Sequence, residues 1–201
     1  MNKIRNPIKK NAKEKKQKII ENGFRLMCEK GYHNVTTIDI ADISGVSTGI
    51  IYQYFNDKFD IFLSGVKNYS NNIMFPLIDI LDNKKISSTN IKDIINEIIE
   101  KLIKSHKMEK KAHEELMAMS HLYEDVSLVF KENELLLTDK IYNLLADTEI
   151  KKTNLKEKIH IAMGLIDNYC HEVVYHKHQN LDYQKMKIEV INTIDYMINK
   201  A

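Results

Sequence analysis

The sequence predicts an all-α protein with two domains. Proline occurs only twice and glycine six times among 201 residues, so few positions interrupt a helix. Apolar residues recur at helical spacing along most of the chain, most regularly over residues 91–103. A third observation is a pair of short helical patterns joined by a tight turn within residues 36–58. We expect one domain over residues 1–66 and a second helical domain over residues 67–201.

The N-terminal part of the chain carries an excess of positive charge. Residues 1–58 hold eleven Lys and Arg against six Asp and Glu, although the whole chain has a formal net charge of only +2. Most of these cations stand before or within the first turns of a helix expected from near Lys13 to Gly31: Lys3, Arg5, Lys9, Lys10, Lys13, Lys15, Lys16 and Lys18. Such an arm attracts phosphate groups in a salt-sensitive way. The alternative is a solvated tail that only aids solubility.

Two short helices are predicted within residues 36–58, which read TTIDIADISGVSTGIIYQYFNDK. Thr36 is a good N-cap, and Asp39 three residues later can complete a capping box. Gly45 suits the positive φ that ends a helix, and Ser47 can cap the next one. The pattern is therefore helix, tight turn, helix.

The second of these helices has one apolar side and one side rich in hydrogen-bonding groups. Ile51 and Phe55 are expected in the core, which leaves the other side chains exposed or at the N-terminal end: Thr48, Gly49, Tyr52, Gln53 and Tyr54. Hydroxyl and amide groups can contact phosphates and base edges, and a glycine lets the backbone approach a phosphate. This is typical of a helix-turn-helix whose second helix enters the DNA major groove. The alternative is an ordinary helical hairpin.

The spacing T-x-x-x-I-A-x-x-x-G-V-S-x-G-x-x-Y-x-Y-F-x-x-K, from Thr36 to Lys58, resembles the N-terminal domain of the TetR (TetR/AcrR) family of transcriptional regulators. The resemblance covers roughly fifty residues. One mild departure is Ser44, where the family more often has alanine. The resemblance implies a homodimeric regulator, usually a repressor, that leaves an inverted-repeat operator when a small molecule binds its C-terminal domain. The C-terminal domain is thus expected to serve ligand binding and dimerisation.

The residues expected to contact double-stranded DNA come from this stretch: Thr36, Thr37, Ser47, Thr48, Gly49, Tyr52, Gln53, Tyr54 and Lys58. Tyr52 and Gln53 are the candidates for base edges. By the resemblance, the phosphate backbone would be held by Thr36, Thr48, Tyr54 and Lys58.

Beyond Lys58 the pattern predicts further helices. One follows Lys58 and ends near Pro76, and others are expected over residues 91–103, 109–121, 125–146, 155–178 and 182–199, with loops at 83–90 and 147–154. The last two helices are apolar on two sides, so each needs two partners. We expect the second partner to be the same helix pair of another chain, with Ile194 near the middle of the interface stripe. The alternative is burial within a monomer.

The identity of the small-molecule effector is not encoded in any motif. Large apolar and aromatic residues that could line a pocket are Met117, Tyr123, Phe130, Met163 and Tyr169, although each also suits an ordinary core.

No metal site or cofactor is expected. Among eight histidines no two are four residues apart, and only Glu157 and His160 form a Glu-x-x-His pair. A metal- or haem-sensing protein, or a helical scaffold with non-specific nucleic-acid contact, remains the alternative function. No phosphate loop or nucleophile motif indicates an enzyme.

Two further features concern the environment of the protein. Cys28 and Cys170 fit no spacing motif and are expected to be buried thiols in a reducing compartment. No apolar run approaches the ~20 residues of a membrane span. We therefore expect a cytoplasmic protein.

Overall fold

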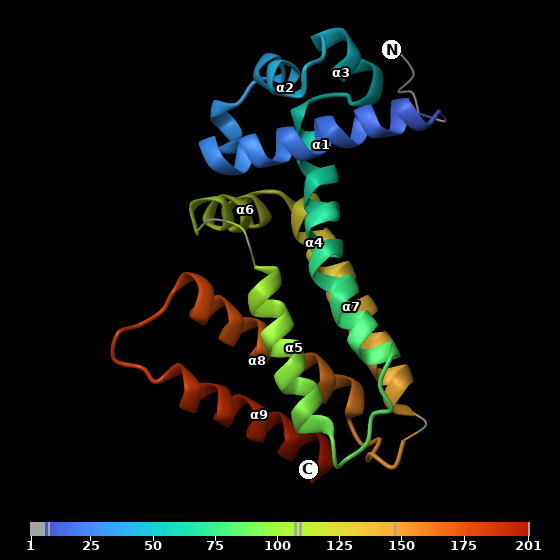
Figure 1. Ribbon diagram of the computed structural model, residues 1–201, viewed down its shortest axis with the longest axis vertical. Helices are drawn as coiled ribbons and strands as arrows, with labels where there is room; N and C mark the ends of the chain where they lie inside the picture. Colours follow the sequence, from blue (N-terminus) through green and yellow to red (C-terminus); the bar gives the residue numbers. More distant parts are fainter. Residues whose placement is uncertain (1–6, 8, 107, 109, 147, 201) are drawn as a thin grey trace. The chain divides into compact units, whose positions relative to one another are not determined.

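The computed structural model describes residues 7, 9–106, 108, 110–146 and 148–200, and for residues 73–76 the backbone alone. Within these residues the chain forms nine α-helices and one 3₁₀ turn and no strand, which confirms the all-α class (Figure 1). None of the described helices combines the length and apolarity needed to cross a membrane. The elements are α1 (Lys10–Lys30), η1 (Tyr32–Asn34), α2 (Thr37–Ser44), α3 (Thr48–Tyr54), α4 (Lys58–Asp82), α5 (Ile91–Ser105), α6 (Lys110–Leu122), α7 (Glu124–Ala146), α8 (Leu155–Tyr175) and α9 (Tyr183–Asn199).

The helices pack into two compact units. The first unit consists of residues 1–70 and 108–129, and the second unit of residues 71–107 and 130–201. Helix α6 and the beginning of α7 therefore pack with the N-terminal helices, although they are distant in sequence. A functional division at residue 66 stays a prediction, but packing assigns part of the expected second domain to the first unit.

The first unit supports α2 and α3 on a fully buried core. Ile19 and Met27 of α1 and Ile40 of α2 have no exposed surface. Helix α4 approaches α1 closely at Gly65, where an added Cβ would lie only 2.3 Å from Cβ of Phe24. Because that neighbour is the stiff base of an aromatic side chain, the two helices can meet here only with glycine.

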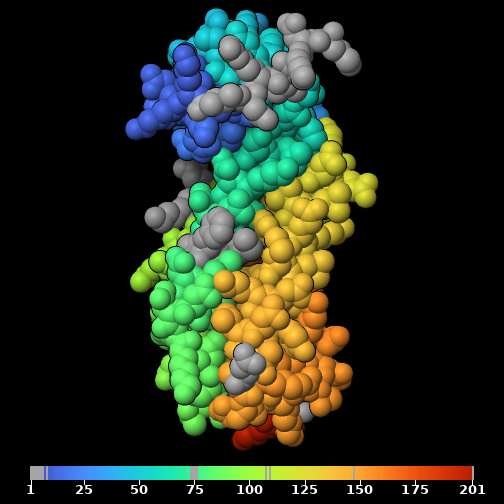
Figure 2. All heavy atoms as spheres, turned by 90° about the vertical axis from the view of Figure 1, so that its right-hand side faces the viewer, coloured from blue at the N-terminus to red at the C-terminus, as the bar shows by residue number. Residues whose placement is uncertain are grey.

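The second unit is built around α5, α8 and α9, which pack against one another. Its core consists mainly of branched aliphatic side chains from all its helices. Residues 71–82 of α4 and 130–146 of α7 lie side by side, as Figures 1 and 2 both show, and Lys140 of α7 pairs with Asp82 of α4 at 2.8 Å. The large aliphatic content makes packing, more than polar contact, the main stabilising term of this unit.

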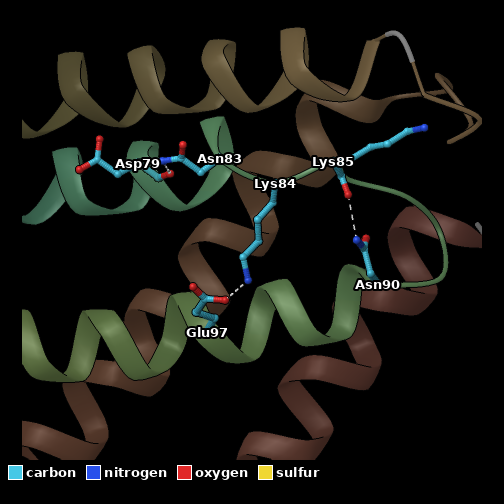
Figure 3. Close-up of polar contacts among 6 residues, drawn as sticks. All are labelled: Asp79, Asn83, Lys84, Lys85, Asn90 and Glu97. Carbon is cyan, nitrogen blue, oxygen red and sulfur yellow. Dashed lines mark hydrogen bonds and ion pairs between the residues drawn. The ribbon is translucent and has the colours of Figure 1, made fainter.

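The loop between α4 and α5 is fastened by polar contacts at both ends (Figure 3). Asparagine side chains donate to main-chain carbonyls and a lysine reaches α5: Asn83 to Asp79 (2.8 Å), Asn90 to Lys85 (2.8 Å) and Lys84 to Glu97. The loop thus holds Ile86, which is 7% exposed, in the core of the second unit.

Three helix limits differ from the prediction by three residues or more. Helix α1 begins at Lys10 instead of near Lys13, and α8 ends at Tyr175 instead of His178. Helix α4 continues past Pro76 to Asp82. A proline inside a helix removes one intrahelical hydrogen bond, and here the burial of Leu77 and Leu81 in the core offsets that loss.

The predicted interface stripe on α9 is wrong in its central member. Ile194 is only 2% exposed and packs in the core of its own unit together with Tyr183 and Ile198. The apolar residues of α9 are covered largely by the neighbouring helices α5 and α8 of the same unit. The large apolar side chains that α8, α9 and the loop between them leave in solvent are others: Ile161, Leu181, Ile188 and Tyr196.

Both cysteines are buried free thiols, as expected. Burial is the main cause that raises the pKa of Cys28 and of Cys170 to about 12. At neutral pH both are therefore protonated and unreactive.

Candidate DNA-binding surface

Helix α2 begins with the predicted capping box. The backbone N–H of Asp39 donates to Oγ1 of Thr36 at 3.2 Å, and the backbone N–H of Thr36 donates to Oδ2 of Asp39 at 2.8 Å. The Thr36 hydroxyl also donates to that oxygen at 2.6 Å. The two hydrogen bonds that Thr36 donates to Oδ2, first the one from its hydroxyl, lower the pKa of the Asp39 carboxyl, which is exposed to solvent. The start of α2 is thus fixed by local contacts.

The turn between α2 and α3 has the predicted left-handed residue. Gly45 has φ 67° and ψ 39°, and the N–H of Val46 donates to the carbonyl of Ala41 at 3.0 Å. Ser47 occupies the N-cap position of α3, but its side chain makes no capping bond there. The two helices are therefore joined by a turn that only glycine adopts without strain.

Helix α3 turns one side to the core and the other to solvent. Ile51 is fully buried, whereas Tyr52 is 51% exposed and Gln53 is also exposed. The hydroxyl of Tyr52 lies 3.1 Å from Oγ1 of Thr37 on α2, so one hydrogen bond spans the two helices. Of the predicted contact residues, the following are exposed or half-buried: Thr36, Thr37, Ser47, Thr48, Gly49, Tyr52, Gln53 and Lys58.

Two lysines of α1 reach the same pair of helices. The ammonium group of Lys16 lies 5.4 Å from the centre of the Phe55 ring at the end of α3. Nζ of Lys18 lies 3.9 Å from the position that a Cβ would take at Gly45. The described part of the basic arm therefore places positive charge beside the turn and beside the end of α3. Lys3 and Arg5 lie outside the described residues.

Comparison with known proteins agrees with this geometry. The family model "Bacterial regulatory proteins, tetR family" matches residues 19–64, which hold most of α1, both short helices and the start of α4. Over these residues the chain has the DNA-binding domain of the TetR family. This confirms the family suggested by the sequence. TetR-family proteins are regulators, so the prediction that the chain is not an enzyme is also confirmed.

Curated relatives in the family are similar mainly in this region. The HTH-type transcriptional regulator HbdR of Aromatoleum sp. is 44% identical over 57 residues, which are 28% of this chain and 25% of HbdR. The uncharacterized HTH-type transcriptional regulator YerO of Bacillus subtilis is 23% identical over 197 residues. That match covers 92% of this chain and 65% of YerO, so the chain spans less than two thirds of both relatives.

Solved structures extend the similarity of fold to nearly the whole chain. A Mesorhizobium loti protein assigned to the TetR family covers 94% of this chain and 97% of its own length, with a TM-score of 0.72 and 15% identity. A Saccharomonospora viridis protein assigned as a transcriptional regulator, solved in complex with choline, has a TM-score of 0.69 and 18% identity, and the match covers 94% of this chain and all of that one.

Tyr54 does not lie where the sequence suggested. It was expected among the exposed residues of α3, but it is only 8% exposed. Tyr54, the last residue of α3, and Phe55, the C-cap residue that follows it, both pack inward in the first unit. A phosphate contact by Tyr54 stays a prediction that its burial makes less favourable.

Lys58 has a structural role that the TetR-family resemblance did not suggest. Its Nζ donates to the carbonyl oxygens of Tyr32 and Val35, both at 2.8 Å, and lies 4.4 Å from the centre of the Tyr32 ring. Burial lowers the pKa of this ammonium group. Because an ammonium has three N–H donors, only one remains for a phosphate.

The connection between α1 and α2 is also held from α6. Oε1 of Glu115 accepts a hydrogen bond from the backbone N–H of Tyr32 at 2.6 Å. The ring of Tyr32 packs edge-on against those of Phe62 and Tyr123, at 5.4 and 6.0 Å between ring centres. Neither Glu115 nor Lys58 was predicted to support the TetR-family helix-turn-helix, because no local pattern marks contacts between residues so far apart.

The predicted pocket residues are divided between the two units. Met117 and Tyr123 belong to the first unit, whereas Phe130, Met163 and Tyr169 belong to the second. The second unit does contain a cavity of about 80 Å³, and of the predicted residues Met163 alone lines it. The hydroxyl of Tyr169 is instead used in the core, where it donates to the carbonyl of Tyr183 at 3.0 Å.

The lining of this cavity is wholly aliphatic apart from one thioether. It comes from all the helices of the second unit: Leu81, Ile86, Ile91, Ile94, Ile95, Ile98, Ile141, Leu145, Ile159, Ala162, Met163, Ile166, Ile194 and Ile198. Such a lining offers no hydrogen-bond partner to a polar or charged ligand.

Proposed function

We propose that the protein is a transcriptional regulator that reads an operator sequence through α3. The supporting observation is the capped two-helix arrangement in which Tyr52 and Gln53 stay exposed while Ile51 anchors the helix. Tyr52 is also held by its hydrogen bond to Thr37, so one face of α2 and α3 presents hydroxyl and amide groups in a fixed arrangement. Side chains of this kind read base edges in the major groove.

The basic residues of α1 supply the sequence-independent part of the affinity. Lys16 and Lys18 lie beside the helix-turn-helix, and the rest of the arm adds further cations. Each phosphate that they neutralise adds to the salt dependence of binding. Operator binding in turn implies a cytoplasmic protein.

Binding of full-length protein to the DNA upstream of its own gene, with random DNA as competitor, tests this function. Gln53→Ala should weaken operator binding by about 1–3 kcal/mol, or roughly 5- to 150-fold, and should leave binding to random DNA unchanged. Gln184→Ala is the matched control, because Gln184 is equally exposed but lies on α9. Equal affinity of the wild type for operator and random DNA would instead favour a helical protein with non-specific nucleic-acid contact.

The proposed regulator acts as a homodimer through α8 and α9. Ile161, Ile188 and Tyr196 are 54%, 56% and 61% exposed on this helix pair, and Ile188 and Tyr196 are eight residues apart on one side of α9. Exposed apolar side chains gathered in this way are typical of an interface. A two-fold dimer would address two half-sites about one helical turn apart, so the operator should be an inverted repeat.

Sedimentation tests the dimer. Wild-type protein should sediment as a dimer at micromolar concentration, and Ile188→Glu should shift it to monomers because a buried interface would receive a charge. Leu122→Glu, at an equally exposed apolar residue of α6, is the control and should remain dimeric. A monomeric wild type would contradict the assignment.

We further propose that a small uncharged apolar molecule releases the operator by entering the second unit. The aliphatic cavity supports this ligand class, and the Saccharomonospora viridis protein, which has a similar fold, was solved in complex with choline. Choline itself is a poor candidate here, because a quaternary ammonium is normally held by aromatic rings and the cavity has none. Candidate molecules can be ranked by the concentration at which they release the operator.

A further inference from the structure

A cluster of two imidazoles and a carboxylate lies in the second unit, outside both sites described above. His106 directly follows the last residue of α5, and Asp167 and His171 stand one turn apart on α8. One ligand atom from each of the three residues lies within 4.8 Å of the other two. No motif of paired histidines marks this group in the sequence, because the pair on α8 is Asp-x-x-x-His and the second histidine follows α5.

His106 is oriented as a metal-binding histidine would be. Its Nδ1 lies 2.7 Å from the carbonyl oxygen of Leu102. Because a carbonyl can only accept a hydrogen bond, Nδ1 carries the hydrogen and Nε2 carries the lone pair. A backbone carbonyl that fixes the tautomer in this way is the usual outer partner of a metal-ligating histidine.

Burial within the cluster falls gradually from His106 to Asp167. His106 is 7% exposed, whereas the side chains of His171 and Asp167 are 27% and 58% exposed. The rings of His106 and His171 meet edge-on at 5.1 Å between their centres. The carboxylate therefore offers an entry point from solvent to two more deeply placed imidazoles.

The cluster contains one carboxylate, whose negative charge suits a cation. Asp167 supplies the single negative charge, lying 3.6 Å from Nδ1 of His171.

We propose that His106, Asp167 and His171 bind a divalent transition-metal ion, with zinc as the first candidate. Imidazole nitrogen and carboxylate oxygen are both zinc ligands, and bonds of about 2.1 Å in a tetrahedron place ligand atoms about 3.4 Å apart. Closing the cluster from a largest separation of 4.8 Å thus needs side-chain movements of only about 1 Å. Three protein ligands leave the fourth position to water or another small molecule.

The position of this site gives the metal a structural consequence. It would clamp the end of α5 to the middle of α8, and the chain passes from the second unit to the first directly after residue 107. Helix α8 also supplies Ile159, Ala162 and Ile166 to the wall of the aliphatic cavity. Resting on the proposed function, the metal would then act as a second effector beside the apolar molecule.

Metal titration of the full-length protein tests the site without DNA, so its result is independent of the regulator function. Chelator-treated protein should bind one zinc per chain in competition with a chromogenic chelator, and cobalt should give a visible d–d absorption. Asp167→Asn and His171→Gln should each weaken zinc binding at least tenfold and abolish the cobalt spectrum. The control is His121→Gln, which removes an exposed histidine of α6 and should change neither.

A second measurement guards against variants that merely unfold. Zinc should raise the melting temperature of the wild type and of His121→Gln, but not that of Asp167→Asn, whose exposed carboxylate can be replaced without disturbing the core. The proposal is overturned if the wild type binds no zinc beyond the level of the Asp167→Asn/His171→Gln double variant. It is equally overturned if His121→Gln loses as much affinity as Asp167→Asn, because the zinc would then sit on surface histidines. His106 would in either case only cap the last turn of α5.

Discussion

The two units are stabilised in different ways. In the first, side chains distant in sequence bond to specific backbone groups around η1, as Lys58 does to the carbonyls of Tyr32 and Val35 and Glu115 to the N–H of Tyr32. In the second, aliphatic side chains from five helices pack around a cavity with no polar lining. Directional bonds fix one geometry, whereas aliphatic packing allows several close alternatives. This difference suits a unit that must present a constant surface beside one that must adapt to a ligand.

The largest effect should come from a truncation in the second unit. Ile99 is fully buried in its core, so Ile99→Ala should lower the free energy of unfolding by about 2–5 kcal/mol. Ile99→Val should cost only about 0.5–1.5 kcal/mol if the packing adapts as proposed. Urea denaturation followed by circular dichroism measures both, with the exposed Lys101→Ala as control. Equal losses for the valine and alanine variants would show a core that cannot adjust.

The next effect concerns Lys58 in the first unit. Lys58→Met keeps the aliphatic stem but leaves the carbonyls of Tyr32 and Val35 without their donor, so the free energy of unfolding should fall by about 1–3 kcal/mol. Lys67→Met, at an exposed lysine of the same helix, should change it little. The salt dependence of DNA binding separates the two roles of Lys58. Unchanged stability together with a slope reduced by about one unit would mean that Lys58 serves a phosphate after all.

The smallest effect should come from the cap of α2. Thr36→Ala removes the acceptor for the N–H of Asp39 and should cost about 1 kcal/mol. Thr36→Ala should also change how the free energy of unfolding depends on pH in the acidic range. Hydrogen bonds from Thr36 lower the pKa of Asp39 in the folded state. Their contribution to stability is therefore complete above the pKa that Asp39 has in the unfolded chain, and it is lost as the pH falls through the lower pKa of the folded state. Unfolding measured across this acidic range should show a weaker pH dependence in the variant. An identical dependence would mean that the capping box does not persist in solution.

The helix-turn-helix was predictable because its limits depend on local chemistry. Thr36 with Asp39 and the left-handed Gly45 act within one turn of chain, and the structure has each as the sequence suggested. For Ser47 only the position was predicted correctly. It is the N-cap residue of α3, but its hydroxyl makes no capping hydrogen bond. The all-α class was predictable because apolar residues recur at helical spacing along most of the chain.

The errors concern residues whose position depends on the rest of the fold. The apolar periodicity of α9 predicts that Ile194 is buried, but it does not show whether α5 and α8 or a second chain covers this residue. Tyr54 and Lys58 match a family pattern, yet Tyr54 is buried and Lys58 donates to the carbonyl of Tyr32 in η1, which a linear motif does not describe. The pocket formed by Met117, Tyr123, Phe130, Met163 and Tyr169 stays a prediction, because a sequence does not show how its residues divide between the two units.

The protonated state of the two native cysteines has a practical consequence for spectroscopy. Thiol-directed fluorophores and spin labels react with the thiolate, and burial keeps Cys28 and Cys170 from forming one near neutral pH. A single cysteine introduced at an exposed position outside the proposed interface, such as Lys101 of α5, should therefore take up a label selectively in the native protein, with both natural cysteines left in place. Motions of the second unit on adding metal or apolar effectors could then be followed from one defined point.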